Sequence, residues 1–142
     1  MLALADVVDV LGLPAKLANR SPIGLVTQIE HGLPIGAVER IARLVAPSDS
    51  QFKYRLVPRA TYERRKATKI LSADEGTRLA RIARVWGLAL GVWKDEEDAR
   101  DFLFRAHPMI EDKRPIDVVI QSEFGAEMVV DILNGLKYGS AA

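Results

Sequence analysis

The sequence contains no cysteine and only two histidines, and this scarcity narrows its possible chemistry. Without cysteine there is no disulfide framework, no thiolate nucleophile and no cysteine-ligated zinc or iron–sulfur site. His31 and His107 lie far apart and form no H-x-x-x-H or H-E-x-x-H spacing, so we expect no metal site. The chain also lacks a G-x-S-x-G motif, a phosphate loop and a dinucleotide fingerprint. We therefore expect no catalytic residues, no cofactor and no enzymatic activity.

Long apolar runs are missing as well. None approaches the roughly 20 residues needed to span a bilayer. The first twelve residues carry Asp6 and Asp9 where a signal peptide would carry positive charge. These features predict a cytoplasmic protein with no membrane contact. At 142 residues, 49% of them hydrophobic, the chain suits one domain or two small units that share a core.

The formal net charge of +1 conceals two oppositely charged regions. Residues 37–70 hold nine Lys or Arg against three acidic residues, whereas residues 94–142 hold six against eleven. Opposite charge in two parts of a chain suggests that the parts have different partners.

Turn and capping signals divide the chain into helices, and no segment has a convincing strand pattern. Ser21, Ser72 and Asp95 are predicted N-caps, and both S-D-S-Q at residues 48–51 and Ser72 to Glu75 have the form of a capping box. The expected helices cover about residues 22–31, 34–46, 48–54, 58–70, 72–93 and 95–106, a short piece after Pro115, and residues 123–137. The predicted fold class is all-α.

Two of these helices, the short one at 48–54 and the basic one at 58–70, are typical of a helix-turn-helix. Apolar spacing places Val57, Ala60, Ala67 and Leu71 toward the core, with Arg64 near that stripe, so its stem would pack. A charge run is often only solvated surface, but the capped preceding helix and the regional basic excess favour DNA. The candidate DNA-binding residues are Arg59, Thr61, Tyr62, Arg65, Lys66 and Lys69.

Apolar stripes also mark the later helices. Trp86 and Trp93 are seven residues apart on the long helix, and Val129, Ile132 and Leu133 form the stripe of the last one. We interpret these five residues as dimer or core positions and expect a homodimer, because a small lobe would not hide so much apolar surface.

From V-P-R-A-T-Y-E-R-R at residues 57–65 onward, the sequence resembles the Xre/MbcA/ParS family of antitoxins, whose partners are RES-domain toxins. The likeness covers about residues 34–139. In the C-terminal part, residue types expected by the family stand at Ala99, Leu103, Pro108, Pro115, Gly125, Val129, Leu133, Tyr138 and Gly139. Three departures are Phe102 in place of tryptophan, M-I-E-D-K-R-P in place of a glycine-containing turn, and Leu56 where many helix-turn-helix motifs have glycine.

The resemblance implies a type II antitoxin that occludes a NAD-consuming RES toxin and represses its own operon by binding operator DNA. It implies an N-terminal region 1–71 with the helix-turn-helix at about 48–70, a connecting helix 72–93, and a toxin-binding domain 94–142. Its implied toxin-binding residues are Pro115, Ile116, Lys137, Tyr138 and Gly139, with a tail beyond Tyr138 that either enters a cleft or frays. The alternative is a stand-alone helix-turn-helix transcriptional regulator whose C-terminal domain only dimerises.

Overall fold

The all-α prediction is confirmed. The computed structural model describes residues 4–14, 16 and 22–139, and within this part of the chain there is no strand, only isolated bridges between Pro34 and Ile70 and between His107 and Lys113. The helices are α1 (Leu4–Val10), α2 (Pro22–His31), α3 (Gly36–Val45), α4 (Lys53–Leu56), α5 (Arg59–Thr68), α6 (Ala73–Trp93), α7 (Glu96–Phe104), the 3-10 turn η2 (Pro108–Ile110), α8 (Pro115–Gln121) and α9 (Glu123–Lys137).

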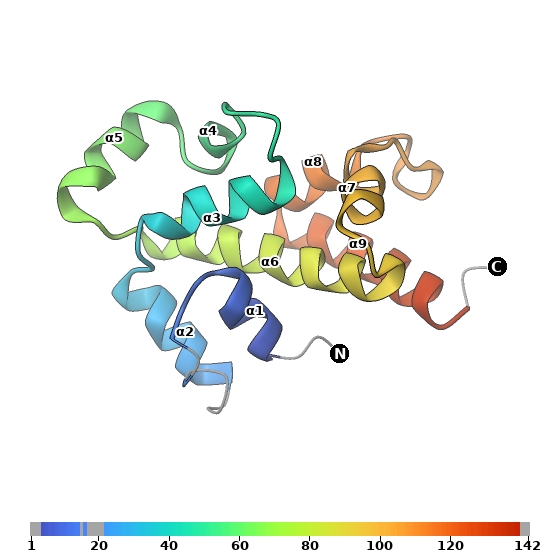
Figure 1. Ribbon diagram of the computed structural model, residues 1–142, viewed down its shortest axis with the longest axis horizontal. Helices are drawn as coiled ribbons and strands as arrows, with labels where there is room; N and C mark the ends of the chain where they lie inside the picture. Colours follow the sequence, from blue (N-terminus) through green and yellow to red (C-terminus); the bar gives the residue numbers. More distant parts are fainter. Residues whose placement is uncertain (1–3, 15, 17–21, 140–142) are drawn as a thin grey trace.

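The long helix α6 is the axis of the molecule. It packs against α1, α2, α3 and α4 and also against α7, α8 and α9. In Figure 1, α1 and α2 lie on one side of α6, α3 lies on the other, and α5 and α7 are at opposite ends. The buried side chains Leu79, Ile82, Trp86 and Ala89 run along α6, so one core passes through both halves of the chain.

Two of the predicted caps are present. Ser72 Oγ accepts from the amide of Glu75 while the Glu75 carboxylate accepts from the amide of Ser72, which completes the capping box of α6. Asp95 caps α7. Ser21, the predicted cap of α2, and the tail after Gly139 lie outside the described residues.

The capping box predicted at residues 48–51 is wrong. The amide of Gln51 donates to Asp49 Oδ1 at 2.9 Å, a local side-chain bond that closes a turn instead of starting a helix. Helix α4 begins only at Lys53 and is four residues long. The basic helix α5 is likewise shorter than its predicted range, and this affects which way it faces.

The turn between α7 and α8 keeps a tight shape without glycine. Glu111 and Asp112 both have left-handed backbone angles, with φ of 56° and 62°. These are conformations that glycine adopts without strain and other residues adopt at a cost of about 1–3 kcal/mol. The turn is closed by bonds from the amides of His107 to Lys113 O and of Asp112 to His107 O, both 3.0 Å.

Candidate functional site

Helices α4 and α5 are both short and are joined by a tight connection. Leu56 ends α4, and Val57 is extended because the pyrrolidine ring of Pro58 excludes helical geometry from the residue before it. Leu56 and Val57 are both fully buried. The connection therefore uses an extended, buried residue where many helix-turn-helix motifs use glycine.

Helix α5 faces the core with a different side from the one predicted. Tyr62, predicted to be exposed, has only 6% of its surface exposed, whereas Ala60 and Ala67, predicted to be inward, are exposed. The prediction was wrong because it used Val57 and Leu71 to define the face, and both lie outside the helix, which covers Arg59–Thr68.

Tyr62 anchors α5 to the body of the molecule. Its ring packs edge-on against Tyr54 with 5.9 Å between ring centroids, and its hydroxyl lies 3.4 Å from Glu39 Oε1. Burial raises the pKa of Tyr62, and the nearby Glu39 carboxylate adds to the shift. Tyr62 therefore positions the helix and is not available to a ligand.

Arg65, predicted to bind DNA, pairs with a carboxylate of the protein instead. Its guanidinium donates from Nε to Glu75 Oε1 at 2.9 Å and from Nη2 to Glu75 Oε2 at 3.2 Å. Burial raises the pKa of the Glu75 carboxyl, but the bonds from Arg65 and Ser72 outweigh it, so this pKa lies below its usual value. Arg65 thus joins α5 to the start of α6.

Arg64, predicted to pack its stem, is exposed instead. Its guanidinium contacts Thr61 Oγ1 at 3.3 Å, and Thr61 itself is half-buried. Spacing assigned the two arginines to the wrong sides of α5, because the facing of the helix depends on the positions of Tyr62 and Glu75.

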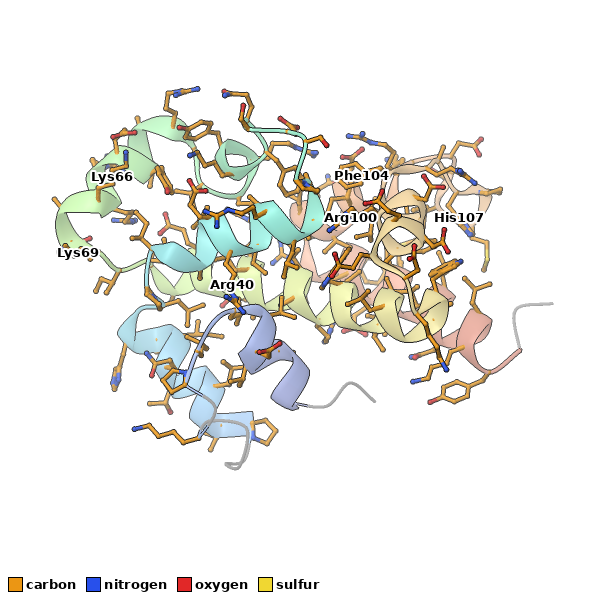
Figure 2. The ribbon with its side chains drawn as sticks, viewed as in Figure 1. Arg40, Lys66, Lys69, Arg100, Phe104 and His107 are labelled. Carbon is orange, nitrogen blue, oxygen red and sulfur yellow. The ribbon has the colours of Figure 1, made fainter. Side chains whose placement is uncertain are left out.

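The exposed face of α5 and its end is strongly basic. Lys66 and Lys69 project from it in Figure 2. Arg59 lies over the Tyr54 ring at 4.0 Å and donates to Gln51 Oε1 at 2.7 Å, which holds its guanidinium in place. The basic residues exposed on this face are Arg59, Arg64, Lys66 and Lys69, with the small side chains of Ala60 and Ala67 among them. The face also carries one exposed acid, Glu63, which pairs with Lys66 Nζ at 3.2 Å. Small side chains allow a ligand to approach the helix backbone closely.

Two of the predicted toxin-binding residues are buried. Pro115 and Ile116 pack into the core at the start of α8, because proline suits the first helical turn and Ile116 is part of its apolar side. They are not accessible to a partner. Lys137, Tyr138 and Gly139 are exposed at the end of α9.

The residues predicted as dimer or core positions lie mostly in the core. Trp86, Val129, Ile132 and Leu133 are buried between α6 and the neighbouring helices. Trp93 is half-buried, and its ring stacks on Phe102 with 4.9 Å between centroids. A single chain buries this apolar surface itself, so the stripe does not require a second copy.

Two family models match consecutive parts of the sequence. Residues 24–84 match the antitoxin Xre-like helix-turn-helix domain, and residues 88–139 match the antitoxin Xre/MbcA/ParS C-terminal toxin-binding domain. The chain belongs to the Xre/MbcA/ParS family of antitoxins. The comparison with curated proteins found no match.

The two matched regions of the antitoxin meet inside α6, between residues 84 and 88. The first contains the basic face of α5, and the second contains α7, α8 and α9. The toxin-binding domain gives the antitoxin a toxin as its partner, and neither domain is enzymatic.

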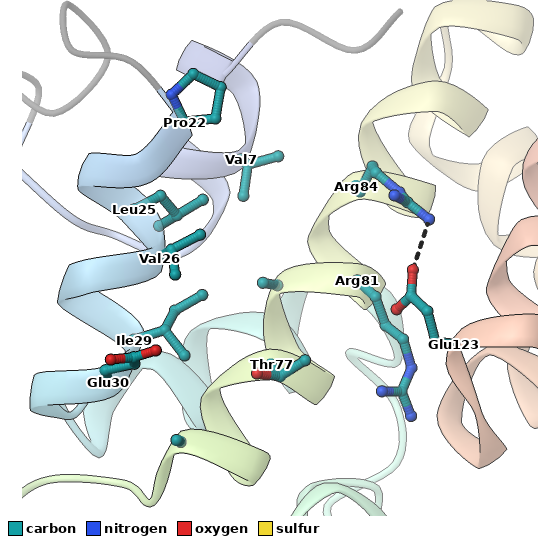
Figure 3. A pocket seen from close by; sticks show the side chains of 12 residues that line it. Val7, Pro22, Leu25, Val26, Ile29, Glu30, Thr77, Arg81, Arg84 and Glu123 are labelled. Atoms are coloured by element: carbon teal, nitrogen blue, oxygen red, sulfur yellow. Dashed lines mark hydrogen bonds and ion pairs between the residues drawn. The ribbon is translucent and has the colours of Figure 1, made fainter.

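An open, mainly apolar groove of about 460 Å³ is lined by residues of α2 and α6 in the antitoxin. Leu25, Val26 and Ile29 of α2 face it, as Figure 3 shows. On its far side Arg84 Nη2 pairs with Glu123 at 3.3 Å.

Among the described residues no three His, Cys, Asp or Glu side chains gather as a metal site would require. The helices in this part of the chain are also too short or too polar to span a membrane.

Proposed function

We propose that this antitoxin neutralises a RES-type, NAD-consuming toxin by occluding its active site and represses its own operon by binding operator DNA. The observation that carries the proposal is the presence, around one long helix, of an Xre-like helix-turn-helix region with an exposed basic helix and an Xre/MbcA/ParS toxin-binding domain. The RES identity of the toxin comes from the resemblance of the C-terminal half to antitoxins with RES partners.

The basic face of α5 supports the DNA-binding part of the proposal. Arg59, Arg64, Lys66 and Lys69 are exposed on a short helix that follows a tight turn. Arginine and lysine bind phosphates, and arginine also reads guanine edges in the major groove. Helix-turn-helix proteins commonly bind two half-sites as dimers, so the proposal includes a homodimer.

The exposed end of α9 supports the toxin-binding part. Lys137, Tyr138 and Gly139 are accessible there, so a partner can contact all three. We propose that this end covers the NAD site of the toxin.

Co-expression tests the proposal directly. The gene neighbourhood is searched for a reading frame that encodes a RES-domain protein, that protein and the antitoxin are produced together, and growth, cellular NAD and co-elution on a sizing column are measured. We expect the antitoxin to relieve growth arrest, restore NAD and elute with the toxin. A chain that binds its upstream DNA but stays apart from the RES protein would instead be a stand-alone regulator.

A further inference from the structure

The toxin-binding domain leaves few large apolar side chains in solvent. In the described part of residues 88–139 they are Met109, Phe124, Met128, Leu136 and Tyr138. Three of them surround one hollow of about 400 Å³ formed by η2, α8 and the start of α9: Met109 is 64% exposed, Phe124 76% and Met128 38%. We call these three residues the Met109–Phe124–Met128 patch.

The α9 side of the patch is held firmly. Phe124 and Met128 are four residues apart and so share one face of α9. Ser122 Oγ accepts from the amide of Gly125 at 2.9 Å, which fixes the first turn of the helix. Gly125 lets α9 approach the Val118 carbonyl so closely that a Cβ at this position would overlap it. Phe124 is therefore presented by a rigid corner between α8 and α9.

The η2 side of the patch is fixed as well. The amide of Met109 donates to His107 Nδ1 at 3.2 Å, and Ile110 is buried beneath the turn. The next two residues, Glu111 and Asp112, have left-handed backbone φ angles. This local construction holds the neighbouring Met109 side chain outward, beside the hollow.

An exposed cluster of methionine and phenylalanine around a hollow has the composition of an interface core. Aromatic residues and methionine are enriched there, and methionine adapts its shape to a partner. The rim of the hollow carries both Glu111 and Lys113, so it has no basic excess for nucleic acid. The patch lies on η2 and α9, within residues 88–139, whereas the basic face of α5 belongs to the other matched region, residues 24–84.

From these observations we infer that the Met109–Phe124–Met128 patch is a docking surface for the toxin, which inserts an apolar side chain into the hollow. The occupant is the toxin because the patch lies within residues 88–139, the toxin-binding domain. Other apolar residues near the patch are buried in the core of this domain, so the three exposed side chains are the ones left for a partner. The inference rests on the proposed function and adds a second contact to the exposed end of α9. A toxin bound here leaves α5 free for DNA.

The test uses Phe124→Asp and Met109→Asp, which change two different elements. Both side chains are exposed, and the carboxylate introduced by Phe124→Asp would lie in the first turn of α9, where a negative charge is favourable, so both variants should fold. Ile23→Asp is the matched control, because Ile23 is 65% exposed on α2, outside the toxin-binding domain. Phe124→Leu keeps the apolar contact and serves as the conservative variant.

The probe is the RES-domain protein used in the co-expression test, and its affinity for each full-length variant is measured by titration, with thermal unfolding as the check on folding. We expect Phe124→Asp and Met109→Asp to weaken binding about 30-fold or more, as loss of a central interface residue does. Ile23→Asp and Phe124→Leu should bind nearly as tightly as the wild type.

Wild-type affinity in both Phe124→Asp and Met109→Asp would overturn the inference and leave the proposed function standing. Failure of the wild-type chain to bind the RES protein would overturn both. If these variants change only the self-association of the antitoxin, measured by light scattering, the patch is a contact between copies and the inference is wrong.

Discussion

Adjacent residues on α5 have opposite roles, and the reason is geometric. A helix turns by about 100° per residue, so Arg64 and Arg65 cannot face the same way. Tyr62 is buried and Glu75 lies at the start of α6, so Arg65 is drawn inward to the Glu75 carboxylate and Arg64 is left in solvent. The exposed arginine, Arg64, is therefore the one available to a ligand.

We expect Arg64→Ala to weaken binding to the DNA upstream of the gene and to flatten its salt dependence, because a phosphate contact releases counterions. Arg65→Ala should instead lower the thermal midpoint and change DNA affinity less, because its guanidinium holds Glu75. Titrations at several salt concentrations, with unfolding curves for both variants, measure the difference. The assignment of the basic face is wrong if Arg65→Ala loses affinity and Arg64→Ala does not.

Sequence alone predicted the helices with strong local caps and missed the facing of α5. The range 123–137 and the caps at Ser72 and Asp95 agree with the structure because a cap is a bond within a few residues. The facing of α5 depends on the contacts of Tyr62 with Glu39 and Tyr54 and on the contact of Arg65 with Glu75. These partners belong to other helices. The burial of Pro115 and Ile116 was missed for the same reason, since it depends on tertiary packing.

Gly125 is a residue whose missing side chain is needed by the fold. We expect Gly125→Ala to destabilise the protein by about 1–3 kcal/mol, because the new methyl group overlaps the Val118 carbonyl and forces α8 and α9 apart. Gly36→Ala, at the first residue of α3, is the control: nothing lies within 4 Å of the added Cβ, so the change should be neutral or slightly stabilising. Urea unfolding compares the two. Equal stability of both variants would contradict the close approach.

At the scale of elements, the start of α6 is the junction that orients the basic helix. Ser72 and Glu75 complete the capping box, and the same Glu75 carboxylate accepts two bonds from Arg65. The end of α5 is further tied to the start of α3, since the amide of Leu71 donates to Leu33 O at 2.8 Å and that of Ile35 to Lys69 O at 3.1 Å. These bonds fix the direction of α5 without a large buried surface of its own.

This junction should depend on pH through Glu75. Its pKa in the folded chain is below the ordinary 4.5, so its contribution to stability is present above about that pH and is lost as pH falls through the folded value. Glu75→Gln should lower the free energy of unfolding at neutral pH by about 1–2 kcal/mol, because the charge-assisted bonds with Arg65 are lost, whereas glutamine at this position still completes the capping box.

The difference between wild type and Glu75→Gln should shrink as pH falls below about 4.5, and urea unfolding at a series of pH values measures it. Asp74→Asn changes an exposed acid in the same first turn of α6 and should have a smaller effect. A constant difference across all pH values would show that the carboxylate charge of Glu75 does not matter.

At the scale of the whole molecule, arginines connect the two halves. Within the helix-turn-helix half, Arg78 Nη1 of α6 donates to Leu56 O at the end of α4, at 2.6 Å. Arg81 donates to Val119 O and Ile120 O in the last turn of α8, both at 2.7 Å. Each arginine satisfies carbonyls that the end of a helix leaves free. Further links join Arg55 to Asp117 at 2.9 Å and Arg100 to Leu44 O at 2.8 Å.

These links, together with the common core along α6, predict that the helix-turn-helix and toxin-binding halves unfold together. Far-UV circular dichroism and tryptophan fluorescence should give coincident urea transitions. Trp86 and Trp93 report on contacts with the toxin-binding half, and circular dichroism reports on all helices.

Arg81→Met keeps the length of the side chain but leaves two carbonyls without their donor. This variant should lower the free energy of unfolding by about 1–3 kcal/mol and preserve the single transition.

Residues 1–93 alone should not fold cooperatively, since their α6 would expose the face that packs on α9. Two separate transitions in the full chain, or a cooperatively folded 1–93 fragment, would show instead that the halves are independent domains.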